Sequence, residues 1–137
     1  MQTNKVALIT GANKGLGLEI ARQLGQQGIT VVLSARDEAK GQAAAATLKA
    51  EGIDAHSVKL EVTNADDIAA LPAYFEKNFG RLDILINNAG IALDQAGRKD
   101  PEAFRQTYET NVIAPWFIAQ ALLPLLKEAP AGSLTRS

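Results

Sequence analysis

The chain has 137 residues, 47% hydrophobic and 21% charged, and a formal net charge of −1 at pH 7. This length suits a single domain, and the composition is that of a globular chain that can bury a core. The near-neutral charge gives no electrostatic reason to expect nucleic acid as a partner. The chain has no cysteine, which excludes disulfides, thiolate catalysis and cysteine-ligated metal. Its one histidine, His56, cannot form a histidine-rich metal site.

The chain shows no sign of a membrane or secretory segment. Polar residues follow Met1 and lead directly into a short apolar run, which is not the pattern of a signal peptide. The longest mostly apolar stretch, Val112–Leu126, falls short of the roughly 18 residues that a membrane span needs. We therefore expect a soluble, cytoplasmic protein without membrane or nucleic-acid partners.

The first half of the chain alternates between apolar runs and helical spacing. Val6–Ile9 is a continuous apolar run, typical of a strand buried on both faces. A glycine-rich turn follows, and then apolar residues at helical spacing over 16–24, with Gly28 as the expected C-terminal cap. The β-branched run Ile29–Leu33 predicts a second strand.

The middle of the chain repeats this alternation. Asp37 opens an alanine-rich helix that is expected to end near Gly52, and His56–Val62 predicts a weaker third strand. Asn64 is the expected N-cap of a helix that carries apolar residues as far as Phe79.

The last part predicts one more strand and a helical region. Leu82–Ile86 is the fourth apolar run, and Pro101 starts a helical region that continues, bent near Pro115, to about Lys127. Strands alternating with helices through short connections predict parallel pairing and a doubly wound α/β sheet of the Rossmann type. We expect one incomplete dinucleotide-binding domain over 1–137, with about four strands.

The turn after the first strand has the spacing of a phosphate-binding loop. Gly11 permits a tight turn, Gly15 allows close approach of a diphosphate, and Gly17 lets the helix pack against the sheet. The N-terminus of the following helix offers unpaired N–H groups to phosphates. The alternative is that these glycines serve only the turn; the strand–turn–helix context favours a dinucleotide site.

The end of the second strand indicates which dinucleotide is bound. An NAD-binding fold places an acid there for the ribose hydroxyl, but this chain has Ala35 followed by Arg36. A guanidinium suits a 2′-phosphate, and Lys14 can reach the same group. Both cations could instead be solvated surface charges, and Asp37 could be the ribose acid, although its place before a helix favours N-capping. NADP(H) is the predicted cofactor.

Taken together, the motifs resemble the short-chain dehydrogenase/reductase family. The resemblance rests on the glycine turn, on Asn111 and on the segment Asn87-Asn88-Ala89-Gly90. Asn13-Lys14 in the turn and Ser34-Ala35-Arg36-Asp37 after it are similar to the NADPH signature of the carbonyl-reductase-like branch. The family's activity is reduction of aldehydes, ketones or quinones by hydride transfer, so the resemblance implies a small carbonyl compound as substrate.

The resemblance also implies roles for individual residues. Asn111 would be the catalytic asparagine, and Arg36 would hold the 2′-phosphate. Glu61 stands where the family usually has aspartate near the adenine, and the neighbouring Val62 can pack against the ring. The residues implied at the phosphates are Asn13, Lys14, Gly15 and Leu16, and those implied near the ribose are Asn88, Ala89 and Gly90. Judged alone, Asn87 and Asn88 could be turn formers and Asn111 a helix-kink residue.

The family's catalytic serine and its tyrosine–lysine pair have no counterpart here. Four residues beyond Tyr74 and Tyr108 lie Asn78 and Val112, so neither tyrosine has the lysine that the family places there. The divergent tail 133–137 does not look like a buried strand and suggests a frameshift, a premature stop or an artificial end.

Two hypotheses remain open. The chain either belongs to an NADPH-dependent carbonyl reductase whose activity needs a further part, or it is a catalytically inactive NADP-binding or oligomerising fragment. If the fourth strand, Leu82–Ile86, were left as an exposed edge, it would favour homo-oligomers through that edge or through the C-terminal helix.

Overall fold

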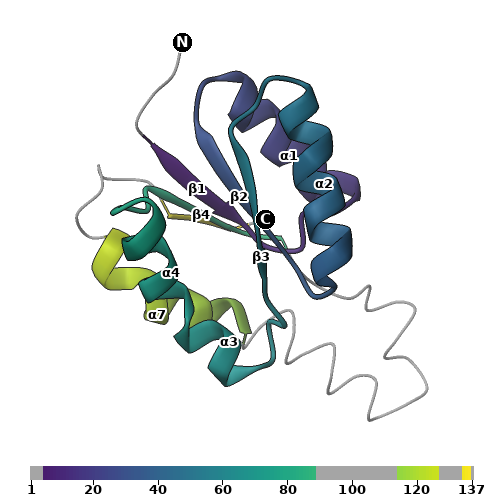
Figure 1. Ribbon diagram of the computed structural model, residues 1–137. Coiled ribbons are helices and arrows are strands. Elements are labelled where there is room, and N and C mark those ends of the chain that lie inside the picture. The colour runs from purple at the N-terminus through teal and green to yellow at the C-terminus, as the bar shows by residue number, and fades with distance from the viewer. Residues whose placement is uncertain (1–4, 89–113, 127–133, 137) are drawn as a thin grey trace.

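A computed structural model describes residues 5–88, 114–126 and 134–136, and places a parallel sheet between two layers of helices (Figure 1). The sheet has five strands in the order β3-β2-β1-β4-β5, and every neighbouring pair is parallel. The strands are β1 (Val6–Ile9), β2 (Thr30–Ala35), β3 (Ala55–Lys59), β4 (Ile84–Asn87) and β5 (Leu134–Arg136). The predicted doubly wound α/β architecture is confirmed.

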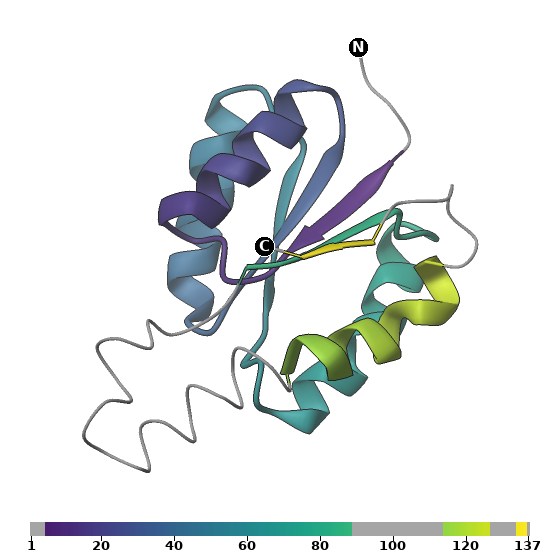
Figure 2. The same cartoon turned by 180° about the vertical axis from the view of Figure 1, so that it is seen from behind.

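The helices cover the sheet on both faces. On one face lie α1 (Gly15–Gln26) and α2 (Glu38–Ala50). On the other lie α3 (Ala65–Ala69), α4 (Leu71–Asn78) and α7 (Ala114–Leu126), as Figures 1 and 2 show from opposite sides. No helix within the described residues is long and apolar enough to cross a membrane.

The continuous apolar runs of the central strands follow from this double cover. All four residues of β1 are buried, and successive side chains enter opposite cores. Val6 and Leu8 pack with α4 and α7, whereas Ala7 and Ile9 pack with α1 and α2. The largest buried side chains of the first core include Phe75, Leu60, Leu71, Leu82, Leu85, Ile118 and Leu122.

Two predicted helix caps are confirmed by their hydrogen bonds. The Asp37 carboxylate accepts from the Lys40 N–H at 3.1 Å, and the Asn64 side chain accepts from the Asp67 N–H at 3.0 Å. Asp37 therefore has the N-capping role that the sequence favoured. Gly28, just beyond the end of α1, has a φ of 86°, the left-handed conformation expected of a C-terminal cap.

The helix predicted from Asn64 to Phe79 is two helices. Ala70 ends α3 and also precedes α4, and Pro72 lies in the first turn of α4. Proline has no N–H to donate to the carbonyl four residues back, so the hydrogen-bond ladder breaks there. The third strand is also shorter than predicted, since β3 ends at Lys59.

Two expectations about the C-terminal end are wrong. The tail 133–137 did not look like a buried strand and was interpreted as divergent, yet Leu134–Arg136 forms β5. The fourth strand was expected to be an exposed edge, yet β5 pairs with β4 along Leu85–Asn87. The reason is that β4 offers a row of backbone N–H and C=O groups, which a short segment can pair with whatever its side chains. The sheet thus has five strands where about four were predicted.

The last described helix is partly as predicted. Ile118, Leu122 and Leu126 of α7 are buried in the core with α4, so one face of this apolar helix is covered. Pro115 is the second residue of α7 and Pro124 lies within it. The predicted start of this helical region at Pro101 lies outside the described residues.

Candidate functional site

The candidate site lies where the parallel strands end. The glycine turn, residues 10–14, follows β1 and leads into α1, Arg36 follows β2, Glu61 comes shortly after β3, and Asn88 follows β4. In open α/β sheets, ligands bind outside the carboxyl ends of the strands, beside a reversal of strand order. Here β1 is that point, because β2 lies on one side of it and β4 on the other.

The glycine turn is fixed from both neighbouring strands. Thr10 donates its N–H to the Ile86 carbonyl at 3.0 Å, and Ala12 donates to the Ser34 carbonyl at 3.0 Å. The Ser34 hydroxyl accepts from the Gly11 N–H at 3.3 Å. Gly11 and Gly15 have φ values of 61° and 63°, in the left-handed region that favours glycine.

Asn88 connects the end of β4 to the same turn. Its N–H donates to the Thr10 hydroxyl at 2.9 Å, and its side-chain amide donates to the Gly11 carbonyl at 3.2 Å. A Cβ added to Gly17 would lie 2.4 Å from this amide nitrogen and 3.0 Å from both the Gly11 carbonyl oxygen and the Ala12 Cα. The position favours glycine because the turn and the Asn88 side chain occupy the space that a side chain on this residue of the helix would need.

The start of α1 has the properties of an anion site. Lys14 is the N-cap residue and its side chain makes no capping hydrogen bond, and the first turn of α1 contains no acidic residue. The first N–H groups of a helix carry a partial positive charge and need acceptors. Gly15 has nothing within 4 Å of an added Cβ, and the Leu16 side chain is 67% exposed. An open helix start without an acidic residue is the setting in which backbone N–H groups bind a phosphate.

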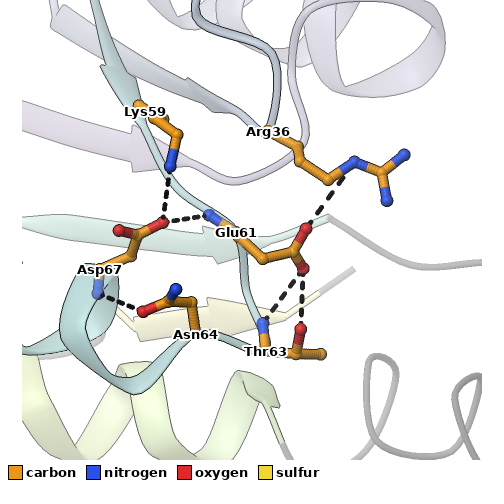
Figure 3. Close-up of polar contacts among 6 residues, drawn as sticks. All are labelled: Arg36, Lys59, Glu61, Thr63, Asn64 and Asp67. Carbon is orange, nitrogen blue, oxygen red and sulfur yellow. Dashed lines mark hydrogen bonds and ion pairs between the residues drawn. The ribbon is translucent and has the colours of Figure 1, made fainter.

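Arg36 and Glu61 face one another at the ends of β2 and β3 (Figure 3). The Arg36 Nε lies 3.8 Å from a Glu61 carboxylate oxygen, and the Arg36 side chain is 80% exposed. Lys59 lies opposite Ala35 in the register of β2 and β3, which places the residues that follow both strands side by side. Val62, the other residue expected near an adenine, is buried.

The described residues bring most of the predicted cofactor-binding positions to this edge of the sheet. Ala89, Gly90 and the predicted catalytic residue Asn111 lie outside the described residues. Asn88, which was expected near a ribose, donates its side-chain amide to the Gly11 carbonyl, and its role toward a ribose stays a prediction.

Sequence reasoning missed two residues that hold the turn, Thr10 and Ser34. Both are buried, and their hydroxyls accept from backbone N–H groups of the turn and of Asn88. The sequence did contain a signal that could have identified them: Ser34 lies inside an apolar strand, and Thr10 directly follows one. A buried hydroxyl needs a hydrogen-bond partner, and in such a strand it finds one in the backbone nearby.

The described part of the chain offers no tyrosine suited to acid–base chemistry. Tyr74 lies in the aromatic group with Phe75 and Phe79, and burial raises its pKa above the ordinary value of a tyrosine. An effective general acid needs a pKa near the working pH, so this shift is in the wrong direction. Among the described residues there is also no cluster of histidine, aspartate and glutamate that could hold a metal ion.

Comparisons with known proteins identify the family of this chain. The family model described as short chain dehydrogenase matches residues 5–135. The chain is 42% identical to carbonyl reductase [NADPH] 3 of Rattus norvegicus over 127 residues, which is 90% of this chain and 46% of that protein. It therefore spans about half the length of the curated relatives it matches.

Solved structures give the same result. Menthone neomenthol reductase from Mentha piperita superposes with a TM-score of 0.87 at 31% identity, over 98% of this chain and 60% of that one. A metagenomic short-chain oxidoreductase in complex with NADP superposes with a TM-score of 0.79 at 34% identity, over 91% and 57% of the two chains. The fold, the glycine turn and these matches establish that the chain belongs to the short-chain dehydrogenase/reductase family of oxidoreductases and is similar to its carbonyl reductases.

Proposed function

We propose that this chain is the NADPH-binding part of a carbonyl reductase, an enzyme that reduces an aldehyde, ketone or quinone by hydride transfer. The nucleotide supplies the hydride when bound. The residues of this chain hold its phosphates, and Asn111 contributes to the proton relay. The names of the relatives, which include carbonyl reductases marked as NADPH-dependent, support this proposal.

One observation carries the choice of cofactor. The Arg36 guanidinium projects at the end of β2, the strand next to the glycine turn, and Ala35 occupies the position where an NAD-binding fold has an acid. Lys14 adds a second cation at the N-cap of α1. An arginine at the end of this strand, in place of the usual acid, together with a lysine at the start of α1, suits a phosphate better than a ribose hydroxyl.

The test of this assignment is the affinity for NADPH and NADH, measured by nucleotide fluorescence. We expect the unmodified chain to prefer NADPH, and Arg36→Ala to weaken NADPH binding about tenfold with little change for NADH. A charge-assisted hydrogen bond contributes about 1.5–3 kcal/mol, and the exposure of Arg36 favours the lower end. Equal affinities in the unmodified chain would defeat the assignment.

A matched control removes a positive charge elsewhere. Lys49 is exposed and lies in the last turn of α2, at the end opposite Arg36. We expect Lys49→Ala to leave the affinities for both nucleotides unchanged. A parallel loss in both variants would mean that net charge, and not the position of Arg36, determines the preference.

The second candidate function is a nucleotide-binding fragment without catalytic activity of its own. The observation that favours it is that neither tyrosine of this chain has a lysine four residues further on. The two candidates share the nucleotide site, and both predict that this chain alone does not oxidise NADPH. They differ in whether NADPH oxidation with a reactive quinone appears when the chain is joined to a part that supplies the family's tyrosine and lysine, so that assay separates them.

A further inference from the structure

We infer that Glu61 is a specificity-determining residue that lowers the preference of this site for NADPH, because its carboxylate opposes the 2′-phosphate at Arg36. This inference rests on the proposed function, in which Arg36 receives that phosphate. The inference goes beyond the proposed function because it gives Glu61 its own effect on the choice between NADPH and NADH.

The carboxylate of Glu61 is held in place next to Arg36. One of its oxygens accepts from both the hydroxyl and the N–H of Thr63, at 2.9 and 3.3 Å. The other oxygen lies 3.8 Å from the Arg36 Nε (Figure 3). Because Thr63 fixes one oxygen, the negative charge stays beside the guanidinium.

The backbone at Glu61 is fixed as well. Its N–H donates to an Asp67 carboxylate oxygen at 2.9 Å, and the same oxygen accepts a hydrogen bond from the Lys59 ammonium at 3.3 Å. Asp67 in turn is held at the start of α3, where its own N–H donates to Asn64. Glu61 is therefore anchored at both its main chain and its carboxylate, and these contacts lie together in Figure 3.

The geometry leaves part of Arg36 available to a ligand. Glu61 approaches the Nε side, and Figure 3 shows the two terminal nitrogens pointing away from it. The side chain is 80% exposed, so these nitrogens can reach an external anion. A phosphate monoester carries a charge of about −1.5 to −2 near pH 7, and it would meet the guanidinium and the fixed carboxylate together.

The charges predict the sign and size of the effect. Glu61 partly neutralises Arg36 and repels the phosphate, so removing its charge strengthens NADPH binding. Because the Arg36 side chain is 80% exposed, the effect is that of a surface charge pair, about two- to fivefold in affinity. NADH has no 2′-phosphate, so its affinity changes little. Any contact of Glu61 with the adenosine half, which the two nucleotides share, cancels in the ratio of their affinities.

The test compares Glu61→Gln with the unmodified chain. Glutamine keeps an oxygen that can accept from Thr63 and removes only the charge. We expect the ratio of NADPH to NADH affinity to rise about two- to fivefold at low salt, and this gain to shrink below about 1.5-fold in 1 M NaCl, where the Debye length is about 3 Å. A purely structural role of Glu61 would not respond to salt in this way.

Controls separate this inference from the proposed function. Glu76→Gln removes a negative charge from an exposed position on α4 and should leave the ratio unchanged. Arg36→Ala, measured in parallel, tests the proposed function itself. If Arg36→Ala abolishes the NADPH preference while Glu61→Gln leaves the ratio unchanged or lowers it, the inference about Glu61 is overturned alone. If neither Arg36 nor Glu61 affects the ratio, the phosphate does not bind here and both ideas fail.

Discussion

Gly17→Ala offers the sharpest test of how the site is assembled. Gly17 lies in the first turn of α1, and an added Cβ would lie 2.4 Å from the Asn88 amide nitrogen. Ordinary contacts are longer by about 1 Å, so Asn88 must move. Its amide would then lose the 3.2 Å hydrogen bond to the Gly11 carbonyl. One methyl group should therefore disturb the phosphate-binding turn through Asn88.

The magnitude follows from three opposing contributions. Inserting a methyl group into a tight contact costs about 1–3 kcal/mol, and losing the hydrogen bond costs about 1 kcal/mol. Alanine gains about 1 kcal/mol over glycine inside a helix. The free energy of unfolding should thus fall by about 1–3 kcal/mol. For a chain of this size, that lowers Tm by about 3–10 °C.

Nucleotide binding is the more informative measurement. In the proposed function the turn holds the diphosphate that NADPH and NADH share, so both affinities should fall by about tenfold or more, unlike the selective loss in Arg36→Ala. Gly25→Ala is the matched control, since its Cβ would lie 2.3 Å from Ile53 Cγ2, about 12 Å further along α1. That variant should lose stability but keep both affinities. If folded Gly17→Ala bound both nucleotides with unchanged affinity, Gly17 and Asn88 would not control the shape of the turn.

Three further predictions concern the chain as a whole. Asp83→Ala should lower the free energy of unfolding by about 2–4 kcal/mol in urea denaturation, because the buried carboxylate accepts from the Val6 N–H and the Arg81 Nε, each at 2.8 Å. Unchanged stability would contradict this. The chain alone should not oxidise NADPH with a reactive quinone, and turnover abolished by Asn111→Ala would overturn that expectation. The chain should self-associate at micromolar concentration, since β5 is the outermost strand of the described sheet; a monodisperse monomer in light scattering would count against it.

The sequence predicts best those features that depend only on residues close to one another along the chain. The strand Val6–Ile9 is confirmed to the residue, because a strand between two helix layers needs four consecutive apolar side chains. The caps at Asp37 and Asn64 are also confirmed, because a cap bonds to the backbone three residues on.

The features that sequence missed depend on partners distant in the chain. Nothing in Leu-Thr-Arg predicts a strand, and β5 forms only because β4 provides a partner. The contact between Gly17 and Asn88 likewise arises from two elements that the sheet brings together. Glu61 was expected beside the adenine, and its position against Arg36 follows from the register of β2 and β3, which periodicity does not encode.

The most direct test of the account is calorimetric titration of the folded, unmodified chain with NADPH and with NADH. We expect one NADPH to bind per chain, about tenfold more tightly than NADH, because Arg36 and Lys14 meet the additional phosphate. If circular dichroism shows a folded α/β protein and neither nucleotide produces binding heat or protection against thermal unfolding, the site does not bind a dinucleotide and the proposed function is wrong.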